Sequence, residues 1–448
     1  MPSQHQRPPA PRLRTIILAL GMLAAATAQA QSLKELYDAA HAYDATYLAA
    51  KALADSAQYK AAQAEALRRP VVALAGSATR TEIDPVAGSN LSANTGKVEV
   101  NARHPLFNRA NAATIDQAYR ALDVAKADLE IAEQDLIVRV SQGYFDVLAA
   151  QDTLATARAN RTGISEQLAS AKRNFEVGTA TITDTREAQA RFDLATAQEI
   201  AADNDLRTKR IALDQLVGRT GIAPKPLAVP VALPPLGAPD PEEWVLRADT
   251  QHPLVRKARL GLDIAKLETA KARAGHLPTV DLIGSVGNTR ETGSAASIGG
   301  GRPGTTRNAT VGVQLNYTLY AGNSIQNRVS ETTILEEKAR NDLEASRRGV
   351  AQATRQTFYG AQSLQAQVKA LEAAESSSKL ALEATQLGYR VGVRVNLDVL
   401  NAQTQLFTTQ RDLAKARYDT VMTSLRLRQA AGQLNPQDVQ AVDALLAR

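Results

Sequence analysis

Apolar residues follow two different spacings along this chain. Over most of its length they recur every seven positions, as in the series Ile115, Leu122, Leu129 and Leu136, and alanines recur at a parallel interval. This spacing lines one side of a helix with apolar and small side chains, which is typical of long helices packed side by side. In four shorter stretches apolar and polar residues alternate, as in a strand with two different faces. The pattern predicts a mainly α fold with a small β part.

The alternating stretches form two predicted β-hairpins, 71–106 and 279–320. Their four strands are residues 71–81, 97–106, 279–289 and 310–320. Each has about the ten residues of a tilted strand that crosses a bilayer, and Phe107 and Tyr320 stand where an interfacial aromatic girdle is expected. The loops between strand partners are long and rich in Gly, Ser and Asn. By pattern alone, soluble hairpins with one solvated face fit equally well.

If these strands cross a membrane, one chain supplies too few of them to form a closed wall. An open sheet edge in lipid leaves backbone groups unpaired at a cost of several kcal/mol each, so several copies must share a barrel. Three copies of four strands give twelve and four copies give sixteen. The pattern does not choose between these numbers.

The order of predicted elements occurs twice. Each half holds an opening helix, a β-hairpin, a long helix and a return helix. The predicted helices are 32–68, 110–174 and 183–217 in the first half, and 241–276, 324–388 and 397–431 in the second. Tyr144-Phe145 recurs as Phe358-Tyr359, 214 positions later. We therefore divide the chain into a signal segment (1–30), a first repeat (31–218), a Pro-rich connector (219–240), a second repeat (241–432) and a C-terminal tail (433–448).

Both halves carry the same short motif between the long helix and the return helix. One copy begins Phe175-Glu-Val-Gly-Thr and the other begins Tyr389-Arg-Val-Gly-Val, and each continues to an aspartate, Asp184 or Asp398. Glycine relieves the backbone where a helix must stop. Each copy therefore predicts the turn of an antiparallel helical hairpin, with the tips near residues 175–184 and 389–398.

Residues 1–30 have the features of a secretory signal peptide. Three arginines precede an apolar run that starts at Ile16, and Ala28-Gln29-Ala30 has the form of a cleavage site. This export signal favours the outer-membrane interpretation of the alternating strands. The chain has no cysteine, which excludes disulfides, a thiolate metal site and a lipid-bearing N-terminal cysteine.

The composition argues against nucleic-acid binding and catalysis. The formal charge is +6, and three signal-peptide arginines supply half of it, so no basic nucleic-acid surface is expected. The five histidines lack metal-ligand spacing. Gly299, Gly301 and Gly304 have the spacing of a nucleotide-binding loop but lie next to Pro303, outside any strand-to-helix context. We predict no enzyme activity, no metal and no cofactor.

The duplicated plan, the signal peptide and the tips Phe175-Glu-Val-Gly-Thr and Gly388-Tyr-Arg-Val-Gly-Val together resemble the TolC family of outer-membrane efflux and secretion proteins. The resemblance covers essentially the whole mature chain. It implies a homotrimer that shares a twelve-stranded β-barrel in the outer membrane of a Gram-negative bacterium, with a long α-helical barrel in the periplasm.

The same resemblance implies partners and a function. The partners are a periplasmic adaptor protein, an inner-membrane transporter of the ABC or RND type, and outer-membrane lipid. The function is an export duct for type I secretion or multidrug efflux. The alternative is a periplasmic structural or adhesive coiled-coil protein without a pore.

The resemblance also assigns roles to residues at the two tips. Polar links that close the entrance would involve Asp184, Tyr389 and Arg394, since hydroxyl and guanidinium groups both donate to a carboxylate. A pore constriction would be formed by Asp398, with Asn401 as the next position on that helix face. The positions expected to dock the adaptor are Val177, Gly178, Thr179, Val391, Gly392 and Val393. The simpler alternative is that Arg394 pairs with Asp398 four residues on, that Asp398 is a solvated helix-surface residue, and that the tips are only helix turns.

Overall fold

The computed structural model describes residues 30–84, 90–228, 230–231, 235, 237–294 and 303–447. Of the predicted signal peptide, residues 1–29 lie outside the described residues. Helices make up 71% of the chain and strands 15%, which confirms the mainly α fold with a small β part. The elements in chain order are α2 (Leu33–Tyr43), α3 (Ala45–Glu65), η1 (Ala66–Arg68), β1 (Val71–Ile83), β2 (Leu91–Phe107), α4 (Arg109–Glu176), α5 (Ile182–Val217), α6 (Pro241–Gln251), α7 (Pro253–Arg273), η2 (Ala274–His276), β3 (Thr279–Thr292), β4 (Gly304–Asn316), α8 (Ser324–Arg390), α9 (Asn396–Ala430) and α10 (Pro436–Asp443).

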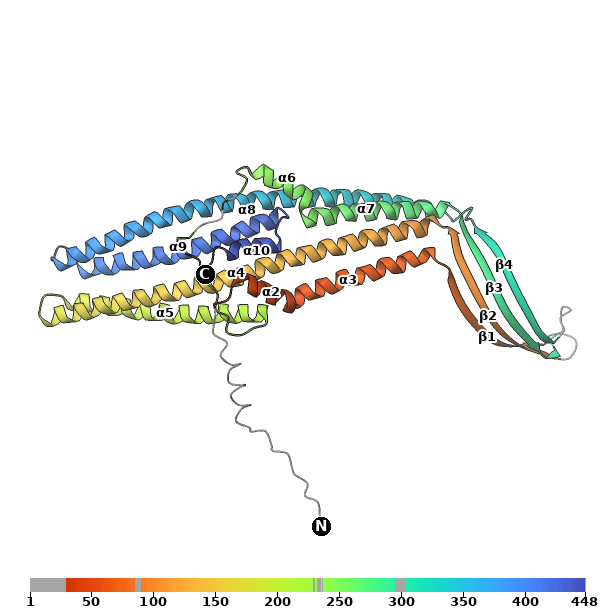
Figure 1. The fold of residues 1–448 in the computed structure, drawn as a ribbon, viewed down its shortest axis with the longest axis horizontal. Coiled ribbons are helices and arrows are strands. Elements are labelled where there is room, and N and C mark those ends of the chain that lie inside the picture. Colours follow the sequence, from red (N-terminus) through yellow and green to blue (C-terminus); the bar gives the residue numbers. More distant parts are fainter. Residues whose placement is uncertain are drawn as a thin grey trace, which may run out of the picture.

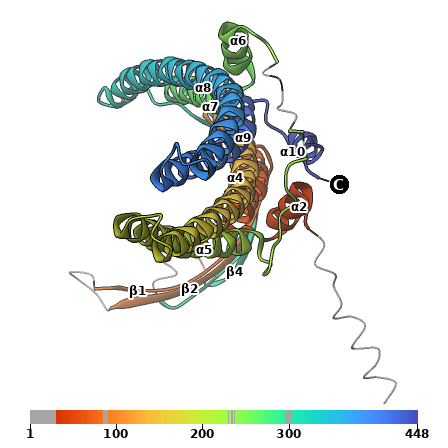
Figure 2. The ribbon, with the colours of Figure 1, turned by 90° about the vertical axis from the view of Figure 1, so that its left-hand side faces the viewer.

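The molecule is an elongated rod with the strands at one end and the two hairpin tips at the other (Figure 1). α4 has 68 residues, so it extends about 100 Å. α3 packs beside the strand-proximal part of α4 and α5 beside its distal part, while α7 and α9 do the same along α8. Because α4 also contacts α7 and α9, the two repeats form one helical layer, which is curved in cross-section (Figure 2). None of the helices in the described ranges is both long enough and apolar enough to cross a membrane.

The four strands form a single antiparallel sheet in the order β1-β2-β3-β4. The alternating pattern predicted two hairpins that contribute four strands, without the order of those strands in a sheet. The structure joins them because β2 of the first repeat pairs with β3 of the second, with Val100 opposite Val286. β1 and β4 are the edge strands. One chain therefore presents one open edge from each repeat.

The strands extend beyond their predicted ends on the loop side. β1 continues to Ile83, which still pairs with Leu91 at the start of β2. β4 begins at Gly304 and ends at Asn316, which lies opposite the first residue of β3. The predicted strand 310–320 was therefore wrong at both ends, and Tyr320 lies beyond the strand. Backbone pairing with β3, and not the alternation of side chains, fixes these ends.

Side chains alternate between two different faces of the sheet. One face, called the apolar face below, carries rows of residues that lie opposite one another on successive strands, such as Leu74, Val100, Val286 and Ala309. The other, called the polar face, carries the intervening residues, among them Lys97, Glu99, Asn101 and Arg103. On the polar face, Arg103 Nη2 donates to Asp281 Oδ2 at 2.6 Å. The sheet thus has one side suited to apolar surroundings and one suited to water.

Each predicted opening helix is divided into two helices. The breaks lie at Asp44, between α2 and α3, and at His252, between α6 and α7, where the backbone is extended. Asp44 Oδ1 accepts from the N–H of Tyr47 at 2.8 Å, and His252 Nδ1 accepts from the N–H of Leu254 at 3.1 Å. These side chains satisfy N–H groups at the start of the next helix. The predictions of 32–68 and 241–276 as single helices are corrected accordingly.

The two breaks are held in different ways. Arg139 of α4 donates to both carboxylate oxygens of Asp44, at 2.9 and 3.0 Å. These hydrogen bonds from Arg139 hold the pKa of Asp44 below its usual range. In the second repeat Ala353 occupies the position that corresponds to Arg139, 214 residues later, and burial lowers the pKa of His252. An ion pair therefore anchors the first break, and a neutral imidazole caps the second.

Replacement of Asp44 by Asn should destabilise the protein by about 2 kcal/mol. Asn caps a helix as well as Asp does, but it removes the charge-assisted hydrogen bonds from Arg139 and leaves Arg139 paired only with the exposed Asp135. Since the pKa of Asp44 is lower in the folded chain than in the unfolded chain, its contribution is complete above the unfolded value of about 3.9. It is lost as the pH falls through the folded value. Urea unfolding followed by circular dichroism should therefore show a larger difference in stability between Asp44→Asn and wild type at neutral pH than at about pH 2. A difference of equal size at both pH values would contradict the ion-pair explanation.

The largest apolar core lies midway along the rod. It is formed by residues of α2, α3, α4, α5, α9 and α10 and of the connector. Tyr144 is fully buried there and donates to the carbonyl of Lys225 at 2.9 Å. The predicted tail 433–448 forms α10, and Val439, Val442 and Leu446 of this segment belong to the core. α2 and α10 lie on the convex side of the helical layer (Figure 2). The tail is thus an integral part of the fold.

Candidate functional site

The first hairpin turns directly after α4. Gly178 has a φ of +78°, a left-handed conformation that favours glycine, and the N–H of Thr179 donates to the carbonyl of Asn174 at 2.8 Å. α5 then begins with a capping box, in which Thr181 Oγ1 accepts from the N–H of Asp184 at 3.2 Å and Asp184 Oδ2 accepts from the N–H of Thr181 at 2.9 Å. Within one chain, the carboxylate of Asp184 therefore binds the start of its own helix.

The second hairpin turns in the same way but starts its return helix differently. Gly392 has a φ of +82°, and the N-cap of α9 is Val395, whose side chain cannot cap. Arg394 Nη1 lies 3.5 Å from Asp398 Oδ2, and both side chains are substantially exposed. This is the pairing expected from the simpler alternative. Within the described part of one chain, Arg394 makes no ion pair with Asp184.

Two hydrogen bonds between side chains join the hairpins of the two repeats near the tips. Asn174 Nδ2 donates to Tyr389 Oη at 3.1 Å, linking the ends of α4 and α8. Arg191 Nη2 donates to Asn401 Oδ1 at 3.2 Å, linking α5 to α9. The structure thus brings two predicted residues, Tyr389 and Asn401, to the contact between repeats. Asn174 and Arg191 were not predicted. A signal for Asn174 was available in the duplication, because Asn174 corresponds to Gly388, the residue before Tyr389.

The helices behind the tips are packed with small and polar side chains. Their apolar cluster has six buried residues, of which three are alanines. Asn396 is buried at the start of α9, and within the described ranges neither of its side-chain polar atoms has a protein partner. Gln403 donates to the carbonyl of Asn160 at 3.4 Å. A buried polar atom without a partner costs about 1–3 kcal/mol, so this end of the rod is held together less firmly than the central core.

Each of the two tips carries exposed apolar side chains at the end of the rod. Val177 is 72% exposed, Val391 65% and Val393 75%. A Cβ added to Gly178 or Gly392 would meet no other atom within 4 Å. We call the six residues Val177, Gly178, Thr179, Val391, Gly392 and Val393 the tip surface. Exposed apolar side chains next to open backbone are typical of a surface that receives a partner.

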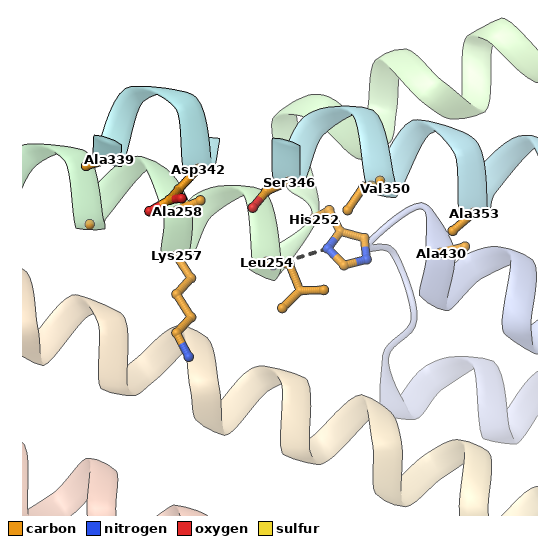
Figure 3. A pocket seen from close by; sticks show the side chains of 12 residues that line it. His252, Leu254, Lys257, Ala258, Ala339, Asp342, Ser346, Val350, Ala353 and Ala430 are labelled. Atoms are coloured by element: carbon orange, nitrogen blue, oxygen red, sulfur yellow. Dashed lines mark hydrogen bonds between the residues drawn. The ribbon is translucent and has the colours of Figure 1, made fainter. Parts of the chain in front are cut away.

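A cavity of about 650 Å³ lies far from the tips, between α7, α8 and the end of α9 (Figure 3). His252 and Ala353 line it. These residues correspond to Asp44 and Arg139 of the first repeat, so the cavity occupies the place of the ion pair that the second repeat lacks. None of the predicted site residues lines this cavity. In the part of the chain that the structure describes, no group of three His, Cys, Asp or Glu side chains could hold a metal ion.

Comparison with known proteins identifies relatives of the whole chain. The family model described as "Outer membrane efflux protein" matches residues 36–219 and 244–433, one segment in each repeat. The chain is 31% identical over 428 residues to the outer membrane protein TolC of Vibrio cholerae serotype O1, covering 95% of this chain and 96% of that protein. It is 34% identical over 313 residues to the alkaline protease secretion protein AprF of Pseudomonas aeruginosa, covering 69% of this chain and 64% of that protein.

A solved structure shares the fold. The outer membrane protein VceC from Vibrio cholerae superposes with a TM-score of 0.76 at 19% sequence identity, covering 89% of this chain and 96% of that chain. At this identity the likeness concerns the fold alone. The arrangement of a short antiparallel sheet on a long curved helical layer is therefore one already seen in an outer membrane protein.

Proposed function

Because this chain belongs to the outer membrane efflux protein family, we propose that three copies of it assemble into an export channel that crosses the outer membrane and the periplasm. The protein is an outer-membrane protein, like its relatives, and these relatives are channels and not enzymes. The proposal concerns the assembly, the position of the gate and the partners.

The open four-stranded sheet is the observation that carries the proposal. Its edge strands expose large apolar side chains, including Leu74 at 73% on β1 and Val311 at 84% on β4. A membrane-embedded sheet cannot leave such edges unpaired, so β4 of one copy pairs with β1 of the next. Three copies then close a barrel of twelve strands, as the family resemblance implies, with the polar face lining the interior.

The helical layer continues this barrel away from the sheet. It is curved in cross-section (Figure 2), so three copies enclose a duct, with the tips converging at the far end. Asp184 and Arg394 make no ion pair with each other within one chain, and we place their contact between neighbouring copies, where the hairpin of one meets that of the next. Three copies of Asp398, with Asn401 beside them, then form the constriction.

The partners of the channel act at its tips. The tip surface is exposed and apolar, which fits docking of a periplasmic adaptor that connects the duct to an inner-membrane transporter of the ABC or RND type. Energy must come from that transporter. The similarity to a protein whose name describes protease secretion supports a polypeptide cargo and type I secretion over multidrug efflux.

Cysteine cross-linking tests the assembly, because the chain has no cysteine of its own. β1 and β4 are three strands apart, about 14 Å at the usual strand spacing, so a disulfide between them cannot form within one chain. We expect Leu74→Cys combined with Val311→Cys, Val313→Cys or Leu315→Cys to give, for at least one pair, oxidised species of up to three linked chains on a non-reducing gel.

The matched control is Leu74→Cys combined with Gly312→Cys, which places the second thiol on the opposite face of β4. This control should give little cross-linking. Light scattering on the purified protein should in addition give three times the mass of the chain. A monomeric particle without cross-linking by any of the three pairs would overturn the trimer.

A further inference from the structure

The apolar face of the sheet ends at a pair of arginines near the loop end. Arg290 of β3 lies opposite Thr305, and Arg307 of β4 lies opposite Asn288, two residues along the same pairing. The two arginines are therefore diagonal neighbours on one face, about 7 Å apart at their Cβ atoms. The next row toward the helices is Val286 with Ala309, where the apolar surface begins.

Neither arginine has an acidic partner within the described residues. On the same face, Glu82 is paired with Arg80 at 2.8 Å. Glu99 lies on the polar face and is paired with Lys97 at 2.9 Å, and Glu291 points to that face because it follows Arg290 in the strand. Two like charges at this spacing repel each other. An anion placed between the two guanidinium groups would remove that repulsion and gain charge-assisted hydrogen bonds.

A groove of about 870 Å³ joins the arginine pair to the apolar surface. Its lining combines Arg290 and Arg307 with Gly96, Val98, Val100 and Val286. Gly96 keeps the groove open beside Arg290, and a Cβ there would meet no atom within 4 Å. Asn288, Thr305 and Asn308 line the groove beside the arginines. One end of the groove is thus cationic and polar and the other is apolar, which matches a molecule with an anionic headgroup and acyl chains.

We propose that this groove, called the arginine groove, binds a lipid that carries phosphate on its headgroup, in the outer leaflet of the membrane. The inference rests on the proposed function, in which the strands cross the outer membrane with the helices on the periplasmic side. The planar guanidinium groups of Arg290 and Arg307 bind the phosphate oxygens, and the acyl chains lie along Val98, Val100 and Val286. The contacts with the acyl chains favour binding of a lipid over binding of free phosphate.

Native mass spectrometry of the full assembly purified in detergent can test the groove, with lipid A as the probe. We expect diphosphorylated lipid A to bind about tenfold more tightly than dephosphorylated lipid A, and inorganic phosphate at millimolar concentration not to compete. Arg290→Gln with Arg307→Gln should remove this preference. The matched control is Arg210→Gln with Arg219→Gln, two exposed arginines of the helical part without an ion pair among the described residues, and it should bind like wild type.

A second variant leaves both arginines in place. Gly96→Val should fill the groove without backbone strain, because residue 96 lies in a strand with open space around its Cβ position, and it should weaken lipid A binding about tenfold. Equal binding of the two lipid A forms by wild type, full competition by inorganic phosphate, or wild-type binding by either groove variant would each overturn the proposal. The trimer mass and the bilayer conductance of the same preparations would be unchanged in that case, which separates failure of this inference from failure of the channel assignment.

Discussion

Channels with Tyr389 replaced by Phe are expected to open more readily than wild type and to carry a larger ion current across a planar bilayer. The hydroxyl of Tyr389 accepts from Asn174 Nδ2 at 3.1 Å and joins the ends of α4 and α8. Loss of one such hydrogen bond removes about 1 kcal/mol, and three copies in the proposed trimer lose about 3 kcal/mol together. The equilibrium between closed and open tips should shift by about 100-fold.

The matched control removes a different tyrosine hydroxyl, which lies at the other end of the rod. Tyr119 Oη donates to Glu65 Oε2 at 3.2 Å near the strands, so Tyr119→Phe should leave the current unchanged.

Asp184→Ala with Arg394→Ala tests the contact placed between neighbouring copies, and should also raise the current. If neither Tyr389→Phe nor this double variant conducts more than wild type, the gate does not lie at these residues.

Replacement of Gly432 by Ala should destabilise the fold strongly, although it adds only one methyl group. Gly432 ends α9 with a φ of +70°, and a Cβ there would lie 2.4 Å from His252 Cα and 2.7 Å from His252 N. A left-handed alanine costs about 1–2 kcal/mol, and the overlap with backbone forces a shift that costs about 1–3 kcal/mol more. We expect a total loss of about 4 kcal/mol in urea unfolding followed by the helical circular dichroism signal.

Gly221→Ala separates the two costs. Gly221 has a φ of +75°, but a Cβ there would meet no atom within 4 Å. It therefore carries only the conformational cost, about 1 kcal/mol. Similar losses for Gly432→Ala and Gly221→Ala would show that the close approach of α9 to the break between α6 and α7 contributes little to stability.

The features that the sequence predicted correctly depend on short-range rules. The seven-residue spacing of Ile115, Leu122 and Leu129 predicted a long helix because helical side chains three and four positions apart share a face. Val-Gly at residues 177–178 and 391–392 predicted the hairpin turns, because only glycine adopts a left-handed conformation without cost. Alternation predicted four strands and their two faces.

The features that were missed depend on contacts between distant residues. Asp44 breaks a helix whose apolar spacing continues, and it does so beside Arg139, which lies 95 positions away. The hydrogen bond between Asn174 and Tyr389 also joins residues that are far apart in the sequence, 215 positions. The contact that joins these two residues is invisible to any local pattern.

By itself, the sequence determined the helices, the alternating strands, the turns and the duplication, since each follows from the conformations that neighbouring residues prefer. Only the tertiary structure decided that β2 pairs with β3, that the tail forms α10 in the central core, and which polar groups join the two tips. These outcomes depend on which surfaces come into contact and on which polar atoms lose their water there. Both are decided only when the whole chain packs.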